Sequence, residues 1–138
     1  MKTIDDFNFE NKKALIRVDF NVPLDENHQV TDTTRIEAAK PTILKVLEDG
    51  GSAILMSHLG RPKGEVVPEL SLDPVSFCLE ELLNAEVLFS DDCISKDAIR
   101  LSKQMLPGEV HLLENLRFYI GETDNDLEFS KHLAEHAD

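Results

Sequence analysis

Cysteine is scarce in this sequence, and long apolar runs are absent. The two cysteines, Cys78 and Cys93, lie far apart and have no second cysteine or histidine at metal-ligand spacing, so we expect free thiols rather than a disulfide framework or a zinc site. The amino terminus lacks the apolar run of a signal peptide, and no later stretch is long and apolar enough to span a bilayer. These absences predict a cytoplasmic protein that contacts no membrane.

Positive charge is also scarce, which argues against a nucleic-acid partner. The chain has 14 lysines and arginines against 27 aspartates and glutamates, a formal net charge of -13. Such a surface would repel a phosphate backbone, which needs many distributed lysines and arginines for affinity. Neither the G-x-x-x-x-G-K-[ST] phosphate loop nor the G-x-G-x-x-G fingerprint occurs, so no nucleotide site is recognisable and a dinucleotide-binding oxidoreductase is disfavoured.

Length and apolar patterning predict one α/β unit. A chain of 138 residues with 41% hydrophobic and 30% charged residues fits one soluble domain spanning 1–138. Strands separated by helices favour an open parallel sheet with helices on both faces, Rossmann-like and incomplete at its carboxyl end. The spacing of apolar residues predicts strands at 14–18, 52–56, 87–89 and 110–113, and helices at 33–47, 73–83, 95–105 and 126–136.

The first expected helix, 33–47, carries two local signals. Thr34 and Glu37 have the spacing of a capping box at its start. Pro41 lacks the backbone N–H that a helix interior uses, so we expect it to interrupt or restart the helix. The sequence therefore predicts a helix with a break near Pro41.

The positions of the arginines point to an anion site. Four of the five lie in short polar clusters at or near the ends of apolar segments. A guanidinium presents a planar fork of donors that matches carboxylate or phosphate oxygens. Because parallel strands end at one edge of the sheet, the polar residues after three strands should line one crevice, with Arg35 at a helix start beside it. These crevice residues are Asp19, Asn21, His58, Arg61 and Arg117.

Three motifs carry a family resemblance. Residues 17–23 (RVDFNVP), 57–62 (SHLGRP) and 112–118 (LLENLRF), in this order, closely resemble the amino-terminal domain of phosphoglycerate kinase. Residues 34–36 and 91–93 also fall where that family has similar residues, so the match covers nearly the whole chain. The resemblance implies a glycolytic phosphotransferase that moves a phosphoryl group reversibly between 1,3-bisphosphoglycerate and ADP, giving 3-phosphoglycerate and ATP.

The resemblance also implies roles for individual residues. Arg35 matches the catalytic arginine that stabilises the phosphoryl group in flight, a role that suits a guanidinium. Arg17 is a supporting member of the basic patch, and no residue is assigned to a metal. The implied substrate-binding set is Asp19, Phe20 and Asn21 around the glycerate hydroxyl and carboxyl end, Arg35, and His58, Leu59, Gly60, Arg61 and Arg117 around the phosphate that is not transferred.

The nucleotide half of such an enzyme is missing from the sequence. In the resembled family, magnesium and ATP or ADP are bound mainly by a second, carboxyl-terminal domain, and the complete enzyme is expected to be a monomer. The 138-residue chain should therefore carry most of the acid-substrate site, bind no cofactor and be inactive alone. A sheet cut at this place also predicts an exposed strand edge and low stability. The alternative is a non-catalytic anion-binding or interaction module on the same scaffold.

Overall fold

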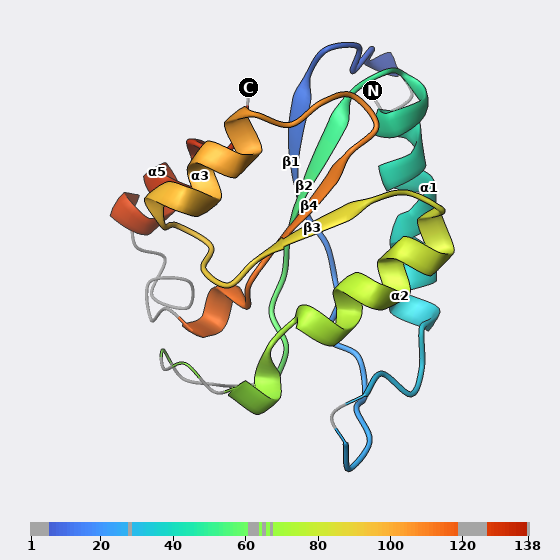
Figure 1. Ribbon diagram of the computed structural model, residues 1–138, viewed down its shortest axis with the longest axis vertical. Helices are drawn as coiled ribbons and strands as arrows, with labels where there is room; N and C mark the ends of the chain where they lie inside the picture. The colour runs from blue at the N-terminus through green and yellow to red at the C-terminus, as the bar shows by residue number, and fades with distance from the viewer. Residues whose placement is uncertain are drawn as a thin grey trace.

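Four apolar runs form one parallel sheet at the centre of the molecule, as Figure 1 shows. The computed structural model describes residues 6–27, 29–60, 64, 66, 68–118 and 127–137. The strand order is β1-β2-β4-β3, so β1 and β3 are the outer strands among the described residues. The predicted α/β class with a parallel sheet is confirmed. The strands are β1 (Lys13–Arg17), β2 (Ser52–Met56), β3 (Val87–Ser90) and β4 (Val110–Leu113).

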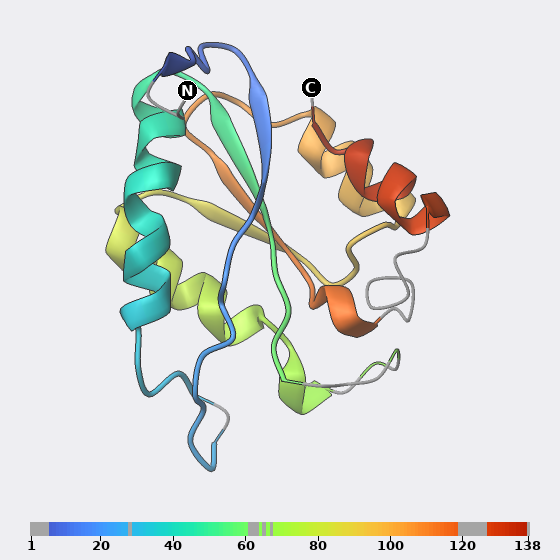
Figure 2. The ribbon, with the colours of Figure 1, turned by 180° about the vertical axis from the view of Figure 1, so that it is seen from behind.

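Helices cover both faces of this sheet (Figures 1 and 2). Along the sequence, the chain forms β1, then β2 beside it, and then β3 two strand positions farther on. It then reverses direction and forms β4 in the position between β2 and β3. Since crossovers between parallel strands are right-handed, this reversal moves the connecting helix to the other face. One face carries α1 (Thr34–Glu48) and α2 (Asp73–Leu83), and the other carries α3 (Lys96–Lys103) and α5 (Leu127–Ala134); the short 3₁₀ helices are η2 (Pro68–Leu70) and η3 (Leu116–Phe118).

Each face of the sheet has its own apolar core. Neighbouring residues of a strand point to opposite faces, and Ile54 and Leu55 of β2 are both fully buried, one in each core. Leu55 packs in the core under α1 and α2, whereas Ile54 packs in the core with Phe129 and Leu133 of α5. Burial of such a side chain contributes about 1.5–3 kcal/mol, so a one-residue slip of β2 would be costly.

The predicted break of α1 is wrong, because the helix runs unbroken through Pro41. Proline removes one backbone hydrogen bond there, but Ile36 and Ile43 on either side of it are buried against the sheet and hold both halves in line. The predicted capping box is also wrong. Instead, Asp32 Oδ1 accepts from the backbone N–H of Thr34 at 2.9 Å and from its hydroxyl at 2.6 Å. These two bonds, the hydroxyl bond first, hold the pKa of Asp32 below its usual value.

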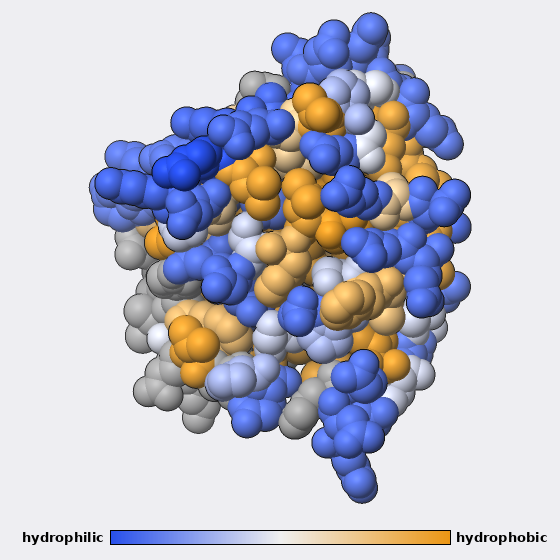
Figure 3. Space-filling view, in the orientation of Figure 1, coloured by the Kyte–Doolittle hydropathy of each residue, from blue (hydrophilic) through white to orange (hydrophobic). Residues whose placement is uncertain are grey.

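Apolar side chains gather near the middle of the face in Figure 3, where β3 crosses. A shallow pocket in this region lies between β3 and α3 and is lined by Phe89, Ala98 and Leu101. The carboxylates of Asp91 and Asp97 line the same pocket, so it does not suit an anion. Among the described residues, no helix has the length and apolar character needed to cross a membrane.

A network of polar side chains, buried apart from the half-buried Ser90, joins β3, β4, α3 and the segment that follows α5. Ser90 Oγ lies 2.7 Å from His111 Nε2, Ser102 Oγ lies 2.8 Å from His111 Nδ1, and Ser102 Oγ lies 2.6 Å from His136 Nδ1. His136 Nε2 is 2.7 Å from the carbonyl oxygen of Cys93. Because a carbonyl oxygen only accepts, His136 Nε2 carries a hydrogen.

The hydrogen on His136 Nε2 determines where the other hydrogens of this polar network lie. His136 Nδ1 accepts from the single hydroxyl hydrogen of Ser102, so Ser102 accepts from His111 Nδ1–H, and His111 Nε2 accepts from Ser90. Burial lowers the pKa of His111 to about 4, and the nearby His136 adds to this effect. Burial also lowers the pKa of His136. Both rings are therefore neutral at pH 7, and every polar hydrogen of these four side chains has an acceptor.

We predict that stability falls as the pH drops from 7 to 5, because His111 stays neutral in the folded protein while a histidine in the unfolded chain takes up a proton near pH 6.5. Linkage gives a loss of about 2 kcal/mol in the free energy of unfolding over this range from His111 alone. In His111→Leu this part of the loss should disappear, as measured by urea unfolding at several pH values. The control His132→Leu, at an exposed position on α5, should keep the loss. The same pH dependence in His111→Leu and the parent would contradict the prediction.

Candidate functional site

The segments that follow β1, β2 and β4 meet at the carboxyl edge of the sheet, at the bottom of Figure 1. Arg17 at the end of β1 pairs with Met56 at the end of β2, so the two loops leave the sheet side by side. Ser57 ties three segments together. Its Oγ accepts from Phe20 N at 3.0 Å, and its carbonyl oxygen accepts from Leu116 N at 2.9 Å. The predicted convergence of these three segments is therefore present.

Asn21 and Gly60 join the loops after β1 and β2. The Gly60 N–H donates to Asn21 Oδ1 at 2.9 Å. Gly60 has a φ of 64°, a left-handed backbone conformation that disfavours residues with a Cβ atom. A Cβ at this position would also lie only 2.8 Å from Leu70 Cδ2 of η2. Glycine therefore lets the loop turn while Leu70 packs directly against it.

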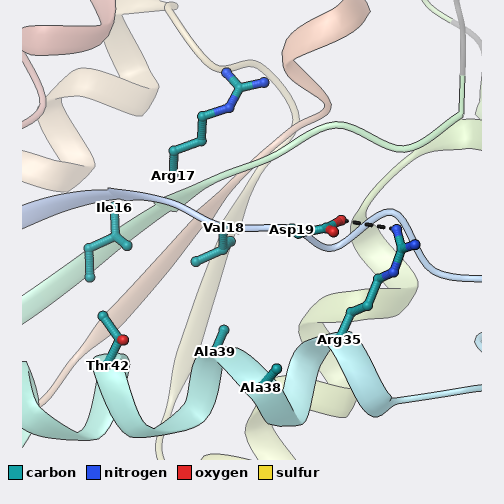
Figure 4. Close-up of a pocket in the computed structure, with 8 residues that line it drawn as sticks. All are labelled: Ile16, Arg17, Val18, Asp19, Arg35, Ala38, Ala39 and Thr42. Atoms are coloured by element: carbon teal, nitrogen blue, oxygen red, sulfur yellow. Dashed lines mark hydrogen bonds and ion pairs between the residues drawn. The ribbon is translucent and has the colours of Figure 1, made fainter.

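Arg35, in the first turn of α1, reaches across to the loop after β1 (Figure 4). Its Nη1 donates to Asp19 Oδ1 at 3.2 Å and to the carbonyl oxygen of Asn21 at 2.8 Å. The two side chains of the ion pair are 52% and 64% exposed, so the pair contributes at most about 1 kcal/mol. The guanidinium is thus oriented by the loop and still open to solvent.

A pocket of about 270 Å³ lies between β1 and α1, with the Asp19–Arg35 pair at one end (Figure 4). Ile16 of β1 and Val18, which follows the strand, point toward α1, whereas Arg17 points to the other side. Arg17 therefore does not join Asp19 and Arg35, and its role in the basic patch stays a prediction. The remaining lining residues, Ala38, Ala39 and Thr42, lie on α1.

The other predicted site residues divide into two groups. Phe20 is fully buried and Leu59 is 2% exposed, so their side chains belong to the core and only their backbones can face a ligand. His58 and Arg117 are half-buried at the carboxyl edge, and Arg117 N donates to Asn115 Oδ1 at 3.0 Å. Arg61 lies outside the described residues.

Three supporting residues were not predicted, although two of the sequence motifs contain them. Ser57 lies in 57–62, and Glu114 and Asn115 lie in 112–118. Glu114 accepts from Leu72 N at 2.8 Å and from the hydroxyl of Ser71 at 2.6 Å. Ser57 directly precedes His58, and Glu114 and Asn115 lie shortly before Arg117, so closeness in sequence to predicted site residues was the available signal.

The fold and this edge define a parallel α/β domain in which Arg35, His58 and Arg117 lie where strands end, an arrangement typical of sites for small charged ligands. The chain belongs to the phosphoglycerate kinase family, because the family model described as "Phosphoglycerate kinase" matches residues 4–138. The resemblance inferred from the three motifs is thereby confirmed.

Relatives and solved structures agree with this assignment. The phosphoglycerate kinase of Chlorobium phaeobacteroides is 52% identical over 133 residues, which are 96% of this chain and 34% of the relative. That of Porphyromonas gingivalis is 57% identical over 120 residues, covering 87% of this chain and 28% of the relative. This chain thus spans about a third of the length of the curated relatives it matches.

Two solved structures have the same fold. The phosphoglycerate kinase structure from Coxiella burnetii is 38% identical with a TM-score of 0.82, covering 96% of this chain and 32% of that one. The structure from Pyrococcus horikoshii is 30% identical with a TM-score of 0.87, covering 100% of this chain and 35% of that one. This chain matches about a third of each solved structure, as it does with the curated relatives.

We predict that Gly60→Ala destabilises the protein more than Gly108→Ala. Both glycines have positive φ, which costs an alanine about 1–2 kcal/mol, but only Gly60 also has a neighbour that the new methyl group would touch. The two free energies of unfolding can be compared by urea titration. Adding Leu70→Ala to Gly60→Ala should return part of the difference. Equal losses for the two alanine variants would show that the contact with Leu70 is unimportant.

Proposed function

We propose that this chain is the amino-terminal acid-substrate domain of a phosphoglycerate kinase, which transfers a phosphoryl group reversibly between 1,3-bisphosphoglycerate and ADP. Family membership supports the reaction class. The observation that carries the assignment to this site is the approach of Arg35 to Asp19 and the carbonyl oxygen of Asn21, which brings the start of α1 to the loop after β1. A small acid bound at this edge would meet a guanidinium, a carboxylate and an amide together.

Asp19 and Asn21 orient the substrate in this proposal. A carboxylate accepts from the glycerate hydroxyl, and an amide can both donate and accept, so the two residues fix the pose of a small chiral acid. Asn21 is already held by its bond to Gly60 N. His58, Arg61 and Arg117 bind the phosphate that is not transferred, with the backbone of Leu59 and Gly60 beside them.

Arg35 stabilises the transferring group. Phosphoryl transfer requires alignment and compensation of developing negative charge rather than covalent chemistry by the protein. The guanidinium is held near the substrate by an exposed ion pair of small net energy, so negative charge on the substrate can replace Asp19 at little cost. Arg35 is therefore placed before the substrate arrives and is free to follow the transferring group.

In this proposal, the nucleotide and magnesium are bound mainly by the part of the enzyme that corresponds to the relatives' length outside this match. Within the described residues, no group of three His, Cys, Asp or Glu side chains is arranged to hold a metal ion. When bound, the nucleotide would supply the phosphoryl donor or acceptor, and magnesium would neutralise charge on its phosphate oxygens. We assign the complete enzyme to the cytoplasm as a monomer, with 3-phosphoglycerate or 1,3-bisphosphoglycerate as its partner on this domain.

We predict that 3-phosphoglycerate binds and that Arg35→Ala and Arg117→Ala each raise its Kd about 10- to 100-fold. A hydrogen bond to a charged group contributes about 1.5–3 kcal/mol, and each 1.4 kcal/mol changes affinity tenfold. Titration calorimetry at several salt concentrations measures both the affinity and its expected decrease with salt.

Arg100→Ala is the matched control for these two variants. It removes the same charge from the exposed face of α3, on the other side of the sheet from α1, and should leave the Kd unchanged. Absence of binding, or equal losses in all three variants, would reject the assigned site. Binding without turnover by the product of the complete reading frame would favour a non-catalytic anion-binding module.

A further inference from the structure

The side chain of Asn115 lies buried among the segments that form the carboxyl edge. It lies between Glu114, which follows β4, and the start of η3, and it has no exposed surface. Its Nδ2 donates to the carbonyl oxygen of Leu59 at 2.8 Å and to that of Leu70 at 3.0 Å. Its Oδ1 accepts from Arg117 N at 3.0 Å. One amide therefore joins the loop after β2, the helix η2 and the helix η3.

These three bonds allow only one orientation of the amide. Leu59 and Leu70 offer carbonyl oxygens, which accept, whereas Arg117 offers an N–H, which donates. Exchange of the amide oxygen and nitrogen would place like groups against each other at all three contacts. Both amide hydrogens and the carbonyl oxygen have partners in the observed orientation, so the side chain is fully satisfied.

Glu114 holds the backbone on which this amide sits. Its Oε1 accepts from Asn115 N at 2.9 Å and from Leu72 N at 2.8 Å, and its Oε2 accepts from the hydroxyl of Ser71 at 2.6 Å. Glu114 is 7% exposed, so these hydrogen bonds lie largely out of contact with water. The start of α2 and the end of β4 are thus fixed to each other, and Asn115 projects from a rigid base.

We propose that Asn115 is a positioning residue for the acid-substrate site: it sets the distance between the loop that carries His58 and Gly60 and the helix that carries Arg117. This inference rests on the proposed function. Leu59 lies between His58 and Gly60, so the bond from Asn115 acts on the backbone next to both. Donor groups from two segments that are far apart in the sequence must meet the oxygens of a single phosphate, and a misplacement of about 1 Å in a catalytic site can lower the rate about 100-fold.

The test uses the product of the complete reading frame and measures its Kd for 3-phosphoglycerate by titration calorimetry. Asn115→Leu keeps the size and neutrality of the side chain and removes all three bonds. We expect about a tenfold higher Kd, which corresponds to about 1.4 kcal/mol. We also expect a weaker dependence of the Kd on salt, because Arg117 no longer reaches the phosphate. Asn115→Ser, in which water can fill the space, gives the same comparison if the leucine variant does not fold.

A matched control separates positioning from general stability. Ser102 is also fully buried and also joins two side chains, but it lies on α3, on the other face of the sheet from α1. Ser102→Ala should lower the thermal midpoint, as Asn115→Leu does, and leave the Kd within about twofold, because buried polar groups contribute to stability wherever they lie. An increase in Kd for Ser102→Ala equal to that for Asn115→Leu would overturn the inference.

A double-variant cycle tests whether Asn115 acts through Arg117. If it does, Asn115→Leu should raise the Kd much less in an Arg117→Ala background, by about threefold or less, because coupled residues are not additive. An unchanged Kd in the single variant, or the same tenfold increase in both backgrounds, would overturn the inference and leave the proposed function intact. If the unaltered protein does not bind 3-phosphoglycerate, the proposed function fails and the inference fails with it.

Discussion

Parallel pairing brings the carboxyl ends of β1, β2 and β4 to one edge of the sheet, and the arrangement of the candidate site depends on this constraint. Each ladder continues almost to the end of its strands, since Arg17 pairs with Met56 and Leu55 with Leu112. The loops that leave the ladders are therefore adjacent before any side chain of the site makes a contact. Burial of apolar side chains on both faces fixes the register, so the two cores also determine which polar residues reach the edge.

Beyond the ladders, the loops are held by side chains that bond to backbone. Ser57, Asn21 and Asn115 each bond to the backbone of a segment far away in the sequence. Glu114 does the same for the start of α2. Such bonds satisfy buried polar groups beyond the point where the hydrogen bonds between strands end. They therefore allow the irregular turns that a binding site needs. Ser57, Glu114 and Asn115 thus hold the loops without a proposed contact to the ligand, whereas Asn21 does both.

The strands were predictable from the sequence because a compact apolar run bounded by turn residues is typical of a buried strand. The strands β2 and β4 have the predicted bounds. The break at Pro41 was predicted wrongly, because local propensity ignores the burial of Ile36 and Ile43 on either side. The role of Asn115 was not predictable from sequence spacing, since Leu59, its partner, is 56 residues away. The resemblance supplied the proposed ligand contacts, whereas the bonds that hold these residues in place were visible only in three dimensions.

A net charge of -13 raises the question of how this domain could bind an acid at all. Charges farther away than about 8 Å are largely screened at physiological salt, so the local groups decide the outcome. Even locally, Asp19 offsets part of the charge of Arg35, so attraction at a distance is modest. Affinity then has to come from short-range bonds between guanidinium groups and phosphate oxygens, and these depend steeply on geometry. An acidic domain that binds an anion therefore requires a rigid frame behind its cations, and the buried bonds of Asn115 and Glu114 supply one.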